Sequence, residues 1–152
     1  MAHYYLAAIS SHNYAVLQQE GFRRYGFKHL HRLKHHPAKG DKVIFYIKGG
    51  PKSLAGIAIV AGNLYEPDPG DLLWSAEDGP FLPHRFDTRP DITLDPADGA
   101  PIQPLVPDLA LFRHGAIKNW SLVLHTQNQE IAPEDYRVIR RALQAAARRA
   151  AR

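Results

Sequence analysis

The stretch KGDKVIFYIKGG, residues 39–50, decides the fold of this 152-residue chain. Its opening KGDK is typical of a tight turn, and residues 43–47 after it are all β-branched or aromatic. A short run of this kind, ended by glycines, predicts a strand that is covered on both faces. Residues 53–64 form a second apolar run that contains Gly56 and Gly62. We therefore expect an antiparallel hairpin, with a bulge or a close backbone approach at these glycines.

Before this hairpin lies another apolar run, residues 3–10, which is too short for a buried helix and predicts a strand. A short helix is expected to follow it through residues 14–17. Ser11 or Asn13 is the expected N-cap of this helix, and Gly21 is the residue expected to end it.

After the hairpin, proline and aspartate are frequent in residues 65–107, so only residues 84–88 and 92–94 are predicted there as short strands. A short helix within residues 104–112 and a brief strand at residues 121–124 complete this part.

The last predicted helix begins at Pro133. Its expected buried stripe recurs at steps of three and four residues and consists of Tyr136, Ile139, Leu143 and Ala146. Together with Ile44 and Ile57, Ile139 is assigned to the hydrophobic core.

The composition excludes several classes of protein. The chain has no cysteine, which excludes disulfide frameworks, zinc ribbons, thiol nucleophiles and iron–sulfur ligation. It has no Gly-x-Ser-x-Gly elbow, phosphate-binding glycine loop or dinucleotide fingerprint. We therefore expect a non-catalytic protein with no catalytic residue, no cofactor and no metal. No apolar run approaches the roughly 20 residues that span a bilayer, and no targeting segment is evident. We expect one domain, residues 1–152, in the cytoplasm and away from membranes.

Charge is distributed unevenly along the chain, whose formal net charge is +4. Residues 21–52 hold nine lysines and arginines against the single acid Asp41, an excess of nine minus one, or +8. Residues 66–108 hold ten acids against Arg85 and Arg89. The basic segment is suited to phosphate, and the acidic segment repels it. Two solvated surfaces that happen to segregate remain the alternative interpretation.

Aromatic residues are interleaved with the cations of the basic segment: Tyr14, Phe22, Tyr25 and Phe27 alternate with Arg23, Arg24, Lys28 and His29. Proteins that bind single strands or flipped bases use this combination, with cations for the phosphates and π faces for the bases. The expected phosphate-binding residues are Arg23, Arg24, Arg32 and Lys34. For Phe22 and Phe27, a core position and a pocket wall are equally open.

Four histidines, His29, His31, His35 and His36, lie within eight residues and raise the hypothesis of a metal site. Such a site normally recruits a carboxylate or a distant ligand at fixed spacing, and no His-Glu-x-x-His motif is present. The favoured interpretation is that these histidines extend the basic face.

The order of these pieces resembles the EVE domain family over roughly residues 3–143. The resemblance rests on the stretches YYLAAIS, SHNY, GF, a basic stretch that holds His29, and GDKVIFY near the start, then PHRF, PIQPL, Leu109 with Phe112, KNW, and Ile131 with EDY and Ile139. It implies the PUA-like fold, which is related to YTH readers of methylated adenine: an α+β domain with a strongly curved mixed sheet, or pseudo-barrel, surrounded by short helices.

The resemblance also implies a pocket for one modified base, and it places around that pocket Ser11, Asn13, Tyr14, Phe22, Lys28, His29, Lys48 and Arg85. Two positions depart from the family and bear on ligand preference. Tyr14 stands where tryptophan is common, and the family's His-Gly-Lys run is represented only by Lys28-His29-Leu30. Packing of Tyr14 against its own helix is the alternative to a place in the pocket.

We therefore expect a reader that flips a modified base, with modified cytosine in DNA favoured, into an aromatic pocket while the basic face holds the backbone. DNA is favoured over RNA as the partner, and any cleavage is assigned to a partner nuclease acting in trans. The alternatives are a sensor of a free modified nucleoside or heterocycle and an RNA-modification enzyme.

Overall fold

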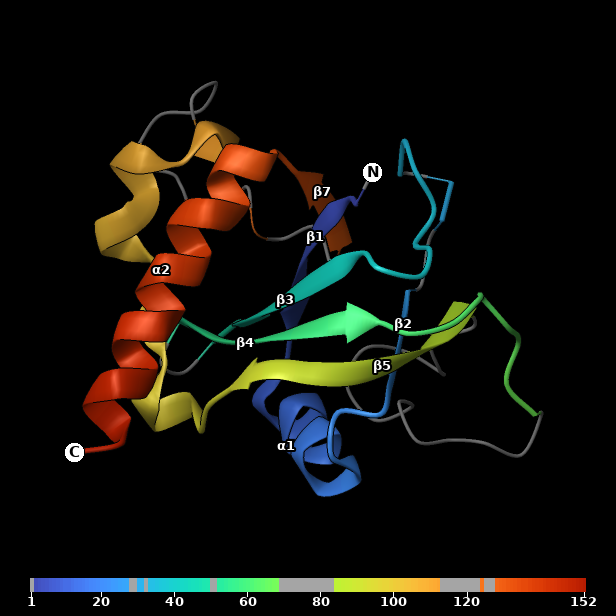
Figure 1. Cartoon of the computed structure of the whole chain (residues 1–152), viewed down its shortest axis with the longest axis horizontal. Helices are drawn as coiled ribbons and strands as arrows, with labels where there is room; N and C mark the ends of the chain where they lie inside the picture. The colour runs from blue at the N-terminus through green and yellow to red at the C-terminus, as the bar shows by residue number, and fades with distance from the viewer. Residues whose placement is uncertain are drawn as a thin grey trace.

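The computed structural model describes residues 2–27, 30–31, 33–49, 52–68, 84–112, 124 and 128–152. The strands are β1 (Tyr4–Ile9), β2 (Arg24–Phe27), β3 (Lys42–Ile47), β4 (Ser53–Val60), β5 (His84–Thr93), β6 (Ala100–Pro101) and β7 (Asn128–Ile131). The α-helices are α1 (Ser11–Glu20) and α2 (Pro133–Ala150), and 3₁₀ helices within the described residues include η1 (Pro96–Asp98), η2 (Gln103–Asp108) and η3 (Ala110–Phe112). One mixed sheet runs in the order β2-β5-β4-β3-β1-β7, and β6 pairs with β4 beside this path. The sheet curls into a half-barrel with helices around it (Figure 1), which confirms the predicted α+β pseudo-barrel.

The predicted strands at the centre of the sheet are confirmed. β3 and β4 form the antiparallel hairpin, and β1 lies parallel to β3 with Tyr4 beside Lys42 and Ile9 beside Ile47. Gly56 is a point of close approach, because a Cβ there would lie 2.9 Å from the carbonyl oxygen of Ile92. Any other residue at this position would force β4 and β5 apart.

Alternation along the strands divides the core between the two faces of the sheet. On β1, Tyr5, Ala7 and Ile9 belong to the cluster that includes α1, whereas Leu6 and Ala8 belong to the cluster that includes α2. The α1 cluster is rich in aromatic rings and the α2 cluster is mainly aliphatic. The predicted core residues Ile44, Ile57 and Ile139 are fully buried in the α2 cluster, as are Leu143 and Ala146 of the predicted stripe and, nearly so, Tyr136.

β5 corrects the prediction of two separate strands, because residues 84–93 form one strand. The first half of β5 pairs with β2 and the second half with β4. Pro90 lies in the second half, where β2 no longer runs beside β5, and the register with β4 shifts next to it. Proline is tolerated at sheet edges and next to such irregularities. Strands β2, β6 and β7 were not predicted.

Two other expectations concern short elements. Residues 103–112 form two 3₁₀ helices, η2 and η3, where one short helix was expected. Of the expected strand at residues 121–124, only Leu124 is described, and it is buried. Within the described parts of the chain, neither helix is long and apolar enough to cross a membrane.

Candidate nucleic-acid interface

α1 begins directly at the end of β1, and its N-cap corrects the sequence prediction. The cap is Ser10, whose Oγ accepts a hydrogen bond from the backbone N–H of Asn13 at 3.1 Å. Ser10 has the extended backbone that an N-cap requires, while Ser11 and Asn13 are already helical. Ser11 is therefore not needed as the cap and is exposed, and Asn13 is buried.

Lys48 joins these residues in space. Its backbone N–H donates to the carbonyl oxygen of Ile9 at 2.9 Å, so the end of β3 lies beside the end of β1. Because β1 and β3 are parallel, the residues that follow them meet at one edge of the sheet. The structure thus brings together Ser11, Asn13 and Lys48 from the predicted pocket.

Tyr14 and Phe22, by contrast, lie in the core. The Tyr14 ring is fully buried, and the rings of Phe22 and Phe45 meet it at centroid distances of 5.5 and 6.2 Å. Its hydroxyl donates to the carbonyl oxygens of Leu94 at 2.6 Å and Ala55 at 3.2 Å. Burial, together with the nearby charge of Asp95, raises the pKa of Tyr14 above its ordinary value. The packing role left open by the sequence is thus observed, and base stacking by Tyr14 stays a prediction that requires the ring to leave this site.

The end of α1 explains the position of Phe22. Gly21 has a left-handed φ of 72° and ends the helix as predicted, and its N–H donates to Gln18 while that of Phe22 donates to Leu17. This paired C-terminal motif usually includes an apolar contact between the residue after the glycine and the last turn. Phe22 and Leu17 accordingly share the α1 cluster. Phe22 also lines a cavity of about 370 Å³ with Gln18, Thr93, Leu94, Asp95 and Asp98. Phe22 is therefore both a core residue and part of the wall of a cavity.

Arg85 is fully buried on β5, where its cross-strand partner on β2 is Gly26. Its backbone pairs in both directions with Tyr65, at 3.0 and 2.8 Å. This burial places Arg85 inside the protein, and its place at the base pocket, which the resemblance implied, stays a prediction.

The predicted phosphate-binding residues fall into separate surroundings. Arg23 and Lys34 are exposed. Arg24 makes a bidentate ion pair with Glu20, with nitrogen–oxygen distances of 3.2 and 3.1 Å, so part of its charge is used within the protein. Arg32, Lys28 and His29 lie outside the described residues.

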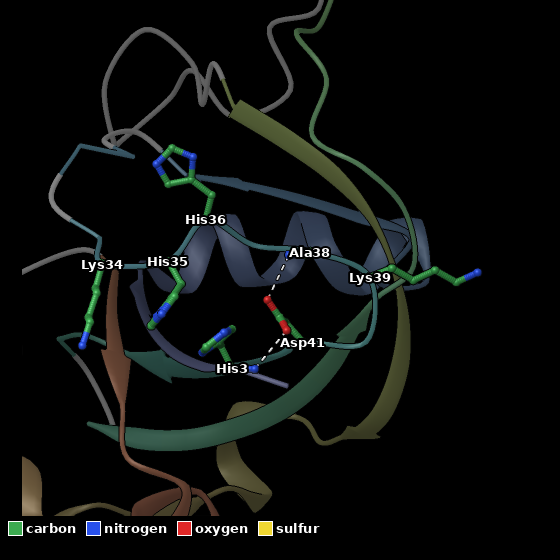
Figure 2. A pocket seen from close by; sticks show the side chains of 7 residues that line it. All are labelled: His3, Lys34, His35, His36, Ala38, Lys39 and Asp41. Atoms are coloured by element: carbon green, nitrogen blue, oxygen red, sulfur yellow. Dashed lines mark hydrogen bonds between the residues drawn. The ribbon is translucent and has the colours of Figure 1, made fainter. Parts of the chain in front are cut away.

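A cavity of about 640 Å³, lined by two lysines and three histidines, opens near the start of β1 and β3. Its lining consists of His3, Lys34, His35, His36, Ala38, Lys39 and Asp41. We call this cavity the basic pocket. Figure 2 shows Lys34, His36 and Lys39 at its rim, with His3 and His35 side by side beneath.

Asp41 is the one carboxylate among the lining residues of the basic pocket. It is 2% exposed and accepts backbone N–H bonds from His3 and Ala38, each at 2.9 Å (Figure 2). Its oxygens are thus engaged within the protein, and the lysines at the rim face solvent. The sequence prediction included Lys34 but missed His3, Lys39 and Asp41. The excess of cations in residues 34–39, beside the Lys-Gly-Asp turn, was the available signal.

One group in this region has the donor atoms of a metal site. His3 and His35 are stacked with ring centroids 3.8 Å apart, and both Nδ1 atoms face the carboxylate of Glu130. All three ligand atoms lie within 4.8 Å of one another.

No protein-family model and no curated protein matches the sequence. Solved structures do match it in fold. The Mmi1 YTH domain in complex with RNA has a TM-score of 0.65 and 14% identity, covering 97% of this chain and 82% of that one. The YTH domain of Zygosaccharomyces rouxii MRB1 in complex with N6-methyladenosine RNA has a TM-score of 0.59 and 14% identity, covering 95% and 83%. Human THYN1 in complex with DNA containing 5-methylcytosine has a TM-score of 0.51 and 14% identity, covering 95% and 98%.

These similarities define the fold of the chain as YTH- and THYN1-like. They agree with the curled sheet and with the placement of helices described above.

Proposed function

We propose that the chain is a non-catalytic EVE-type domain that binds nucleic acid carrying a modified base. The observation that carries the proposal is the basic pocket, because the exposed Lys34 and Lys39 at its rim suit a phosphate backbone. The proposal is supported by neighbours of the same fold that were solved with N6-methyladenosine RNA and with 5-methylcytosine DNA. Modified cytosine in DNA is the proposed target.

The proposed base-binding region lies at the other end of β1, where Ser11, Asn13 and Lys48 meet. β1 has six residues, so this region is about 15–20 Å from the basic pocket. A strand whose phosphates lie at the basic pocket can therefore present a nearby flipped base to the end of α1.

The backbone contacts are tested by reversing charge in the basic pocket. Lys34→Glu with Lys39→Glu should weaken binding to modified and plain oligonucleotides alike. It should also lower the slope of log K against log salt by about one unit for each phosphate that the protein no longer neutralises. The matched control is Arg141→Glu with Arg149→Glu, which makes the same charge change on the exposed side of α2. Equal reductions in affinity for the two double variants would refute a specific role for the basic pocket.

The base-binding region is tested with oligonucleotides that differ in one methyl group on one cytosine. Lys48→Ala should reduce the ratio of modified to plain affinity by about tenfold, which is the effect of about 1.4 kcal/mol. Lys52→Ala, an exposed lysine of the same hairpin, should leave the ratio unchanged. If the wild-type protein bound modified and plain oligonucleotides with equal affinity for every modified base tested, the proposal that it recognises a modified base would be refuted.

The smaller cavity beside Phe22 favours a second candidate, a sensor of a free modified nucleoside. Asp95 and Asp98 line this cavity, and their carboxylates repel phosphate but can accept hydrogen bonds from the amino groups of a base. A free nucleoside should bind with little dependence on salt, whereas the nucleic-acid reader loses affinity steeply. Mass measurement of incubated RNA separates both from an RNA-modification enzyme, which alone changes the mass.

A further inference from the structure

We propose that His3, His35 and Glu130 form a binding site for a divalent first-row transition-metal ion, with zinc as the reference ion. The proposal is independent of nucleic-acid binding. It rests on three ligand atoms from three segments: the residue before β1, the segment between β2 and β3, and β7.

The distances suit one shared ion. The Nδ1 atom of His35 lies 3.0 Å from each carboxylate oxygen of Glu130, and the Nδ1 atom of His3 lies 3.4 Å from Oε2. Ligands at about 2.0–2.2 Å from a tetrahedral zinc ion are themselves about 3.3–3.6 Å apart. The two contacts to Glu130 therefore need to change by only a few tenths of an ångström when an ion enters. The two imidazole rings, which are stacked at an interplanar angle of 16°, must turn relative to each other so that both Nδ1 lone pairs point at the ion.

Strand alternation and register explain why the three side chains meet. His3 and Tyr5 are two residues apart and lie on the same face of β1. Glu130 is the antiparallel partner of Tyr5, which places its side chain on that face too. The hydroxyl of Tyr5 donates to the backbone carbonyl oxygen of His35 at 2.9 Å and thereby holds His35 over β1.

One further contact holds the site in place, and the charge of one ligand favours a cation there. The backbone N–H of His3 donates to the buried carboxylate of Asp41, which fixes the first ligand on the sheet. The Nδ1 atoms of both histidines face the carboxylate of Glu130, and its negative charge favours a cation between the ligands.

The donor set indicates the class of ion. Two imidazoles and one carboxylate suit zinc, cobalt, nickel and copper, whereas calcium and magnesium prefer oxygen ligands only. The side chains of His3, His35 and Glu130 are 29%, 40% and 25% exposed, so an ion can enter from solvent and keep at least one water. An ion here would fix the segment that carries Lys34 and His36 against β1 and β7.

The test uses untagged, chelator-treated protein, because a histidine tag would bind the same ions. Cobalt(II) chloride is the first probe, since a site with three protein ligands and a tetrahedral geometry produces strong visible absorption that aqueous cobalt lacks. Zinc titrated by calorimetry should bind with one ion per chain and should displace the cobalt spectrum. Absence of both the spectrum and the zinc heat in the wild-type protein would overturn the proposal.

Variants locate the site. Glu130→Gln keeps the shape of the side chain and should weaken zinc binding at least tenfold, and His35→Ala should do the same. His36→Ala is the matched control, because His36 is an exposed neighbour that projects away from His3 and His35 (Figure 2). A reduction in the control equal to that in His35→Ala would place the ion elsewhere and refute this site. Circular dichroism of each variant confirms folding. If Glu130→Gln fails to fold, the cobalt absorption spectra of the wild-type protein and of the His35→Ala and His36→Ala variants still show whether an ion binds at this site.

Discussion

The two faces of the sheet are packed with different side chains. On the α1 face, aromatic rings meet mostly edge to face, as Tyr14 does with Phe45 and Phe27 does with Phe86. Polar groups such as the Tyr14 hydroxyl are satisfied inside this core. On the α2 face, aliphatic side chains fill the space between the sheet and one long amphipathic helix. Packing on the α2 face thus follows from the spacing of apolar residues in the sequence. Packing on the α1 face depends on the relative orientation of the aromatic rings and on hydrogen bonds within the core. Among the predicted site residues that the structure describes, Ser11, Asn13 and Tyr14 lie on α1 itself, and Phe22 belongs to the α1 cluster.

The largest expected effect is on the α1 face. Phe45 is fully buried, and its ring contacts those of Tyr14, Phe22 and Tyr25. Phe45→Ala should lower the free energy of unfolding by about 3–5 kcal/mol, because it removes a large side chain and leaves a cavity among rings that cannot collapse easily. Urea unfolding measures the decrease. A decrease below about 1 kcal/mol would show that the aromatic packing is loose.

The corresponding change on the α2 face is Ile139→Ala. Ile139 is fully buried on α2, and the substitution should lower the free energy of unfolding by about 2–4 kcal/mol. The smaller side chain leaves a smaller cavity, so the decrease should be less than for Phe45. The reverse order in urea unfolding would contradict the distinction drawn between the two faces.

Tyr14→Phe tests the polar contacts within the aromatic core. Removal of the hydrogen bonds to Leu94 and Ala55 should lower the free energy of unfolding by about 1–2 kcal/mol at neutral pH. The variant should also change the alkaline profile. Tyr14 ionises near its ordinary pKa of 10.0 in the unfolded chain but keeps its proton in the folded one, because burial raises its pKa.

Above about pH 10 the folded state therefore holds one more proton than the unfolded state. The stability that Tyr14 contributes by keeping its proton is fully present below that pH, and it is lost as the pH rises toward the raised pKa. The wild-type free energy of unfolding should fall more steeply than that of Tyr14→Phe above about pH 10, by up to about 1.4 kcal/mol per pH unit. Parallel profiles would mean that the ring is not held in the core, and would strengthen its predicted role in the pocket.

The smallest expected effect lies outside both cores. Arg140 of α2 forms an ion pair with Asp91 of β5, and both side chains are partly exposed. Arg140→Ala should lower the free energy of unfolding by less than about 1 kcal/mol, because solvent screens the pair. The difference should shrink further in about 1 M salt. Arg141→Ala, at an exposed neighbouring position, is the control and should have no effect.

The central strands and α2 were predictable because their residues carry strong signals. Residues 43–47 are β-branched or aromatic, and the stripe of α2 recurs at helical spacing. β7 was missed because its sequence, Asn-Gln-Glu-Ile, has no strand propensity of its own and is held by its register with β1. β2 has only four residues and one of them is glycine, so it too has little strand propensity of its own and was missed.

The candidate site was less predictable. Ser11, Asn13 and Lys48 were identified through the resemblance, and the structure brings them together. His3, His35 and Glu130 are far apart in sequence, and only the parallel pairing of β1 with β3 and the antiparallel pairing with β7 bring them together. No local pattern of residues contains that information.

The position of β1 also governs how the chain folds. β1 lies between β3 and β7, and Tyr4 pairs with Ile131, so the two partners are 131 minus 4, or 127, residues apart. Contacts of such long sequence separation form late, and folding dominated by them is slow. During synthesis one edge of β1 must stay open until β7 emerges from the ribosome, and an open, apolar strand edge is a site of aggregation. A nascent chain that stalls before residue 128 would therefore depend on chaperones to remain soluble.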